Sequence, residues 1–278
     1  MTTAPLAEVH NADRFGGKAV QLGLATRAGL PVPDGYAIDW EFVEAMASGD
    51  PAACSSLRTL CAKLPGPLAV RSSAVGEDSS EASFAGQHVT RLNVLGFDAV
   101  RIALEEVWRS GRSDGAKAYR MRMGADPLAR VGVVIQRLVA ADVAGVMFTC
   151  DPVSGRPEIV IEAGWGLGEA IVQGLVIPDR YRIAGPGNVL ERRPGTKSVA
   201  IRLAADGGVY HETVSSIDAR RLCLGYGDLR ALQNLATRCD AVFGPEPHDI
   251  EWASHAGQLF LLQRRPVTQM ARKSPLLV

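Results

Sequence analysis

Residues 249–266 read DIEWASHAGQLFLLQRRP, and this stretch decides the fold of the C-terminal part of the chain. Residues 249–253 and 259–266 alternate apolar and polar side chains, as strands with one buried face do, and a glycine lies between them. A hairpin closed by a three-residue loop at 256–258 places Glu251 directly opposite Gln263. Arg265 lies two residues further along and therefore on the same face.

The three side chains predicted to share this face suit a metal–nucleotide phosphate site. Directly opposed side chains on one sheet face have Cβ atoms about 5 Å apart. Mg²⁺ takes oxygen ligands and usually keeps substrate phosphates as further ligands, while arginine binds phosphate bidentately. Glu251 and Gln263 are therefore candidate metal ligands, and Arg265 is a candidate phosphate contact. The alternative is an ordinary solvated hairpin face.

Composition bounds the class of protein. The chain has 278 residues, of which 47% are hydrophobic, so it can bury a large core. Its 30 basic residues balance 30 acidic ones, which gives no charge-driven argument for a nucleic-acid or membrane partner. The 5 cysteines include no CxxC pair, and no apolar run approaches membrane-spanning length. We expect a cytoplasmic protein with reduced thiols.

Helices and strands follow one another irregularly along the chain. We expect helices at 17–28, 99–110 and 228–243, strands at 68–71, 131–138, 143–149 and 158–162, and further short strands within 180–214. Because regular strand–helix–strand alternation is missing, the pattern predicts an α+β (or α/β) fold with mixed or antiparallel sheets. We expect one unit of residues 1–278, with two lobes of approximately 1–138 and 139–278.

Lys18 follows two glycines at the start of an expected helix. Free backbone N–H groups and the helix dipole favour an anion at such a position, and the lysine would add a mobile charge. The segment is not a Walker A loop, because Ala19 stands where that motif has Ser or Thr. A glycine turn with a solvated lysine is the alternative interpretation.

Two further segments carry groups suited to phosphate. Arg71 lies where an expected strand enters a polar loop, and an arginine held there can clamp a phosphate. Residues 81–90 are small and polar around Gly86 and end at Thr90, so backbone amides and hydroxyls could approach phosphate oxygens. The alternatives are a surface arginine and a surface loop.

The histidines next to these motifs are not expected to carry a phosphoryl group. Residues 254–256 read Ser-His-Ala, which is similar to the core of a phosphohistidine carrier, but they fall in the predicted hairpin turn. We interpret His255 as a turn residue and His88 as a loop side chain.

Together these motifs resemble the N-terminal ATP-grasp domain of phosphoenolpyruvate synthase, pyruvate phosphate dikinase and rifampicin phosphotransferase. The resemblance runs nearly end to end and in the family's order. The matching stretches are GGKAVQLG at 16–23, GLPVPDGY at 29–36, AVRSSAVGEDSSEASFAGQHVTRLNV at 69–94, VVIQRLV at 133–139, GVMFTCDPVSG at 145–155, GWGLGEAIVQGLVIPDRY at 164–181, and DIEWA with LFLLQRRP. It implies an ATP-grasp fold whose two lobes enclose ATP.

The resemblance implies a role for each candidate on the nucleotide side. Lys18 and Arg71 would hold the phosphates of ATP, and the loop with Gly86 and Thr90 would cover them. Gln136 would face the adenine. The family's loop usually reads Gln-Gln-acidic-Thr-aromatic, whereas residues 87–91 here read Gln-His-Val-Thr-Arg, so the cover can differ in charge.

On the metal side, the resemblance agrees with the hairpin argument. Glu251 and Gln263 would hold Mg²⁺, and Arg265 would contact the transferring phosphoryl group. The catalytic residues implied are Lys18, Arg71 and Arg265. Phosphoryl transfer depends mainly on positioning and charge neutralisation, so these cations and a metal are sufficient.

Three functions remain open. Enzymes of the family carry a swivelling phosphohistidine domain and a separate acceptor-binding domain, which the sequence does not match. We therefore expect an ATP-dependent phosphotransferase that passes phosphate directly to a small-molecule hydroxyl or amine, such as an antibiotic or a biosynthetic intermediate. The alternatives are an ATP-binding subunit that phosphorylates a separate histidine-carrier protein, and a nucleotide-binding module without catalysis.

Overall fold

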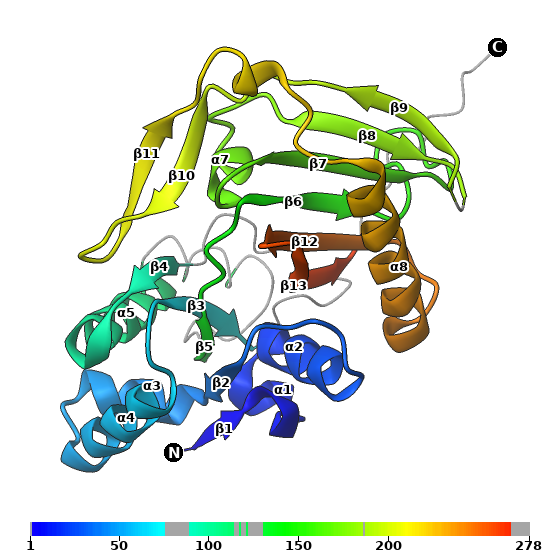
Figure 1. Ribbon diagram of the computed structural model, residues 1–278. Coiled ribbons are helices and arrows are strands. Elements are labelled where there is room, and N and C mark those ends of the chain that lie inside the picture. The colour runs from blue at the N-terminus through cyan, green and yellow to red at the C-terminus, as the bar shows by residue number, and fades with distance from the viewer. Residues whose placement is uncertain are drawn as a thin grey trace. The chain divides into compact units, whose positions relative to one another are not determined.

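The computed structural model describes residues 2–75, 89–113, 117, 121, 130–185 and 187–267. The chain forms two compact units, Met1–Leu138 with Leu203–Tyr210, and Val139–Arg202 with His211–Val278. Each unit is built around one antiparallel sheet (Figure 1).

Five strands form the sheet of the first unit, called sheet A below. In spatial order they are β1 (Thr3–Pro5), β2 (Gly35–Ile38), β5 (Val131–Arg137), β3 (Leu68–Ala74) and β4 (Thr90–Val94). Neighbouring strands are antiparallel throughout. The central strand β5 has six buried residues in succession, so both faces of the sheet are covered.

Helices pack on both faces of sheet A. They are η1 (Leu6–Glu8), α1 (Ala12–Phe15), α2 (Gly17–Arg27), α3 (Trp40–Ala47), α4 (Pro51–Lys63) and α5 (Gly96–Gly111). Val133 and Ile135 of β5 join a core with Val43 of α3, Leu57 of α4 and Leu104 of α5. The side chain between them, Val134, joins a second core with Phe15 of α1 and Leu22 of α2. Strand alternation thus separates α3–α5 from α1–α2.

Local signals in the sequence explain where α3 and α4 begin. Asp39 accepts a hydrogen bond from the backbone of Phe42 at 2.9 Å and caps α3, and Asp50 caps α4, whose first residue is Pro51. Aspartate is a favoured N-cap, and proline is favoured at the first helical position. The sequence analysis did not predict these two helices.

Two details of the expected helices are wrong. The helix expected at 99–110, for which the preceding Asp98 is the cap that the sequence offers, begins at Gly96, so Asp98 lies in its first turn and does not cap it. In α2 the spacing of apolar residues predicts that Leu24 is buried, but Leu24 is 36% exposed, and Ala19, Leu22 and Ala25 are the buried apolar residues. The second error arises because packing against neighbouring elements, rather than local periodicity, decides the buried face.

Six strands form the sheet of the second unit, called sheet B below. In spatial order they are β13 (Gln258–Pro266), β12 (His248–His255), β6 (Val143–Phe148), β7 (Ile159–Trp165), β8 (Asp179–Ile183) and β9 (Val189–Arg193). All neighbours are antiparallel. The C-terminal hairpin therefore occupies one edge of the sheet, and β12 pairs with β6 about a hundred residues earlier.

One face of sheet B is covered by α8 (Tyr226–Phe243), as Figure 1 shows. Trp252, Met147 and Tyr181 on this face are almost fully buried, as are Leu232 and Leu235 of α8. The opposite face carries the alternate residues of each strand, including Glu251, and is called the polar face below.

The remaining elements of the described chain are short. They are α7 (Glu169–Val172), β10 (Val199–Leu203), β11 (Val209–Thr213) and η2 (Asp218–Arg220), of which β10 and β11 pair with each other. The predicted α+β class with antiparallel sheets, as expected of an ATP-grasp-like fold, is confirmed.

Candidate phosphate and metal site

The C-terminal hairpin brings Glu251 opposite Gln263, as predicted, but by a different route. The predicted three-residue loop at 256–258 is wrong, because His255 pairs with Gln258 and the turn has two residues. Its residues Ala256 and Gly257 have φ of 48° and 78°, the signature of a type I′ turn. A β-bulge between Glu251 and Trp252 then shifts the register by one and restores the predicted pair.

The three predicted side chains lie together on the polar face. Gln263 pairs with Glu251, and Arg265 pairs with Asp249. Arg265 Nη2 donates to Glu251 Oε1 at 3.0 Å across the diagonal of the hairpin. Gln263 is only 4% exposed, while Glu251 and Arg265 are partly buried. The hairpin thus presents oxygen donors and a guanidinium within one small area.

Asp249 is a fourth member of this cluster that the sequence analysis missed. Burial raises the pKa of Asp249 to about 6; the charge of Arg265 lowers it and that of Glu251 raises it. Its buried Oδ1 has no hydrogen-bond partner within the described part of the chain. The signal was present in the sequence, because Asp249 and Glu251 alternate with Ile250 along a strand and must share a face.

These residues fit a hard divalent cation. Carboxylate and amide oxygens are the ligands that Mg²⁺ prefers, and it binds proteins through one or two carboxylates plus phosphate oxygens. Among the residues that the structure describes, no group of three or more His, Cys, Asp or Glu side chains is arranged to hold a metal by itself. The buried, unpartnered oxygen of Asp249 is the kind of atom that a nearby cation would satisfy.

Lys18, the predicted phosphate ligand of the first unit, is buried and not solvated. It lies in the first turn of α2 and is 4% exposed. Its Nζ donates to the carbonyl oxygen of Ser72 on β3 at 2.9 Å, and the adjacent Ala19 N–H donates to Ser73 Oγ at 3.0 Å. The helix start is therefore bonded to β3, and the alternative of a solvated lysine is wrong.

A tight approach of backbones holds this junction. Gly16 has φ of 82°, and a Cβ at this position would lie 2.1 Å from the carbonyl oxygen of Ser73. Only glycine can occupy such a position without moving β3. The glycine that the sequence analysis assigned to anion binding thus has a packing role beside Lys18.

Sheet A brings together the other described candidates of the first unit. Arg71 of β3 pairs with Thr90 of β4 on one side and Val134 of β5 on the other, so Arg71 and Thr90 are cross-strand neighbours on one face. Gln136 lies on that face too, two residues along β5 from Val134. Gly86 lies outside the described residues, as does His88.

Gln136 is held in place by its neighbours. It is 3% exposed, and its Nε2 donates to the carbonyl oxygen of Pro33 at 3.1 Å. Gly35 lies directly opposite, where a Cβ would come within 2.6 Å of Gln136 Cγ. The side chain predicted to face adenine is therefore buried and oriented by the segment before β2.

His255 was predicted to be a turn residue, but it is the last residue of β12 and pairs with Gln258, directly beside the turn. Its Nδ1 is 3.4 Å from Asp142 Oδ2, and half of the side chain is exposed.

No helix in the described ranges combines the length and apolar character needed to cross a membrane.

Comparison with known proteins identifies the family. The family model described as the pyruvate phosphate dikinase AMP/ATP-binding domain matches residues 52–276. Rifampicin phosphotransferase from Bacillus subtilis is 37% identical over 73% of this chain and 23% of its own length. A probable phosphoenolpyruvate synthase from Methanothermobacter thermautotrophicus is 32% identical over 92% of this chain and 44% of its own length.

A solved structure of D-alanine–D-alanine ligase from Bacillus anthracis, complexed with ATP, is similar at a distance. It matches 94% of this chain and 58% of its own, with a TM-score of 0.41 and 11% identity, too low to support an argument about function. This chain spans less than half the length of the two relatives above. The family match covers most of the sequence, and the chain belongs to the family of the pyruvate phosphate dikinase AMP/ATP-binding domain.

Proposed function

We propose that this protein is an ATP-dependent phosphotransferase that transfers phosphate from Mg·ATP to a small-molecule hydroxyl or amine. The observation that carries the proposal is the hairpin cluster, in which Glu251 pairs with Gln263 and bonds Arg265 at 3.0 Å. A carboxylate, an amide oxygen and a guanidinium in one place suit a metal-bound phosphate. The chain belongs to an AMP/ATP-binding family, which supports ATP as the nucleotide that carries this phosphate.

Each candidate residue has a role in this proposal. Glu251 and Gln263 hold Mg²⁺, which neutralises charge on the phosphate oxygens when it is bound. Arg265 donates to the phosphoryl group as its charge develops during transfer. Lys18 and Arg71 bind phosphate oxygens of the nucleotide.

Thr90, Gly86 and Gln136 complete the proposed nucleotide site. Thr90 is the cross-strand neighbour of Arg71, which supports a hydroxyl contact to phosphate. Gly86 lies outside the described residues, and its proposed role in covering the phosphates comes from the family resemblance. Gln136, oriented by Pro33, lies beside the adenine.

Direct transfer to a small molecule is favoured among the open alternatives. One relative is a rifampicin phosphotransferase and the other a probable phosphoenolpyruvate synthase, and both names refer to a small molecule. Because this chain matches only part of either protein, the acceptor is not transferred from them. Transfer to a separate histidine-carrier protein, which the family resemblance also suggests, is the second candidate.

A module that only binds nucleotide is less well supported. Binding alone does not need a guanidinium held beside the metal ligands, whereas transfer does. Identifying AMP or ADP by mass after incubation with Mg·ATP and candidate acceptors distinguishes transfer from binding.

The metal site is tested with Glu251→Ala and Gln263→Ala. Each should weaken Mg²⁺-dependent ATP binding by about tenfold or more, because an ionic or oxygen contact to the metal is lost. Calorimetry with and without Mg²⁺, together with turnover, measures this. Glu212→Ala on β11, whose carboxylate bonds Arg202, is a control that should bind normally. Unchanged Mg·ATP affinity and unchanged turnover in both site variants contradict the assignment.

A further inference from the structure

We propose that Glu162 and Arg180 form a binding site for a small hydroxy acid on the polar face of sheet B. In that site the carboxylate of the ligand binds Arg180 and its hydroxyl binds Glu162. The inference rests on the proposed function and names a chemical class for its acceptor. It follows from strand register, burial and the hydrogen bonds that these two side chains lack.

The register of sheet B places this pair in line with the metal cluster. Glu251 of β12 pairs with Val146 of β6, Val146 pairs with Glu162 of β7, and Glu162 pairs with Arg180 of β8. Directly paired residues of neighbouring strands point to the same face. With strands about 4.8 Å apart, Glu162 lies about 10 Å from Glu251 along this row. A small acceptor bound there is within reach of a phosphoryl group extending from the metal.

Arg180 and Glu162 face each other but are not joined. Both side chains are only partly exposed, and no hydrogen bond or ion pair links them within the described part of the chain. Arg180 Nε is buried and has no hydrogen-bond partner among the described residues. A buried polar atom without a partner is costly, and a ligand oxygen at this point would satisfy it.

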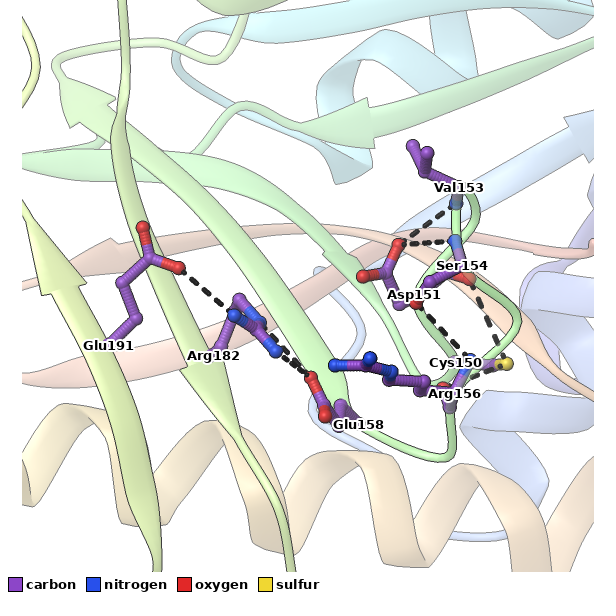
Figure 2. A network of polar contacts seen from close by, with 8 residues as sticks. All are labelled: Cys150, Asp151, Val153, Ser154, Arg156, Glu158, Arg182 and Glu191. Atoms are coloured by element: carbon purple, nitrogen blue, oxygen red, sulfur yellow. Dashed lines mark hydrogen bonds and ion pairs between the residues drawn. The ribbon is translucent and has the colours of Figure 1, made fainter.

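Arg182, on the same strand and the same face, is the informative contrast. Figure 2 shows its guanidinium bonded to Glu158, at 2.6 and 3.0 Å, and near Glu191 at 3.5 Å. Arg182 is therefore saturated by its own protein neighbours. Arg180 lies opposite Glu162 and Arg193, and its Nε has no such partner among the described residues.

Asp151 is a further charged group near Arg180, and its carboxylate is hydrogen-bonded within its own loop. Asp151 follows β6, and its Oδ1 accepts the backbone N–H groups of Val153 and Ser154 at 2.9 and 3.2 Å (Figure 2). Burial raises the pKa of Asp151, but these hydrogen bonds and the charge of Arg180 lower it by more. The net shift of the pKa is therefore downward. Asp151 is thus an anion held by its own loop, and it does not occupy the Nε of Arg180.

The chemistry of the pair selects the ligand. A guanidinium fork binds a carboxylate through two parallel hydrogen bonds. An ionised glutamate is only an acceptor, so it requires a donor such as a hydroxyl. Paired Cβ atoms about 5 Å apart match the span of a two- or three-carbon molecule that bears both groups. A molecule with only one of these groups satisfies half of the site.

The test uses the full chain saturated with Mg²⁺ and a non-hydrolysable ATP analogue. D-Glycerate and L-lactate are the probes, glycerol and acetate carry only one of the two groups, and binding is followed by calorimetry and ligand-observed NMR. The hydroxy acids should bind at least about tenfold more tightly than glycerol or acetate. Arg180→Gln should remove this preference, and the matched control Arg182→Gln should retain it. Arg180→Lys, which keeps the charge but loses the fork, should bind with intermediate affinity and replaces the Gln variant if that fails to fold.

Three outcomes overturn the proposal. The first is that the unmodified protein shows no preference for hydroxy acids, and the second is that the Arg180 and Arg182 variants lose hydroxy-acid affinity equally. The third is that Arg180→Gln loses affinity for the ATP analogue, which would place the arginine at the nucleotide. Affinity for the ATP analogue reports the proposed function, and glycerate binding reports this site. Normal analogue binding without hydroxy-acid discrimination rejects only the site, whereas absent analogue binding rejects the proposed function.

Discussion

Arg264 and Arg265 are neighbours on β13 that point to opposite faces of sheet B and meet different partners. Arg264 donates to His248 Nδ1 and lies over the ring of Phe243 at 4.7 Å, on the side of α8. Arg265 bonds Glu251 on the polar face. Strand alternation alone separates a packing role from a proposed catalytic one in adjacent residues of the same type.

Arg265→Lys tests whether Arg265 acts in the transition state. The variant should bind Mg·ATP nearly normally and turn over roughly a hundredfold more slowly, because a single donor to a developing anion contributes about 3 kcal/mol. Lysine offers a point charge in place of a planar fork. Calorimetry and steady-state kinetics separate the two effects. Normal kcat with a strongly raised KM for ATP would mean that Arg265 only anchors the nucleotide.

At the scale of residues, the sequence predicted those site members whose neighbours are local. The carboxylate, amide and guanidinium of the hairpin are at most 14 residues apart, and alternation was enough to align them. The burial of Lys18 could not be predicted, because its partner Ser72 lies 54 residues away. The same alternation places Asp249 on the face of Glu251, so its membership of the cluster could have been predicted but was missed.

Among the elements, the C-terminal hairpin depends on details that periodicity does not encode. The predicted loop was one residue too long, and the β-bulge after Glu251 was not foreseen. The two differences offset each other, so the predicted pair is correct although the path to it is not. A bulge is set by packing of β12 between β13 and β6, which a reading of the hairpin alone does not include.

Ala256 in the turn of this hairpin offers a stability prediction. Its φ of 48° is unfavourable for alanine, whereas asparagine tolerates this region and Asn-Gly is the preferred type I′ pair. Ala256→Asn should raise the free energy of unfolding by about 0.5–1 kcal/mol, since the left-handed conformation costs alanine about 1 kcal/mol. Urea unfolding measures it. Gly257→Val, at φ of 78°, should destabilise, and equal stabilities for all three proteins would contradict the turn assignment.

His248 links α8 to sheet B and predicts how stability depends on pH. Burial, followed by the charge of Arg264, lowers the pKa of His248 to about 4, from an unperturbed value of about 6.5. Because Arg264 donates to Nδ1, the neutral ring carries its proton on Nε2, which lies 3.2 Å from Asp240. The folded state therefore disfavours protonation of this ring.

The sign of the effect follows from the lowered pKa. The contribution of His248 to stability is fully present above pH 6.5 and is lost as the pH falls towards 4. Between pH 8 and pH 5 this amounts to about 2 kcal/mol. Between pH 8 and pH 5 the unmodified protein should therefore lose about 2 kcal/mol more of its free energy of unfolding than His248→Gln loses. Urea unfolding of both proteins at the two pH values measures the difference. Parallel pH profiles of the two proteins would exclude a neutral buried histidine.

For the molecule as a whole, the sequence predicted the α+β class and antiparallel sheets but not the order of the strands. Sheet A places β5 between β2 and β3, and sheet B joins β12 to β6, so the decisive pairings connect distant segments. Such pairings depend on which buried faces fit one another, and a periodicity within one strand does not contain that information. The helices α3 and α4 were missed although Asp39 and Asp50 mark their starts.

The last prediction concerns the route of the phosphoryl group through the whole molecule. The chain contains 5 histidines, and direct transfer requires none of them as a carrier. His255, beside Asp142 at the hairpin turn, is the one whose sequence context is most similar to a carrier, and it is half exposed. His255→Ala should keep at least about half of the activity, because an exposed turn residue contributes little to stability or to the transition state. His88→Ala should behave alike.

Incubation with ATP labelled in its β- or γ-phosphate, followed by mass spectrometry of the protein, makes the test complete. No acid-labile, base-stable phosphate should remain on any histidine, while label should appear in the small-molecule acceptor. Arg265→Lys, assayed in parallel, should reduce labelling of the acceptor without affecting the histidines. Phosphohistidine that forms on His255 or His88 and disappears together with activity in the alanine variant would replace direct transfer with a carrier mechanism.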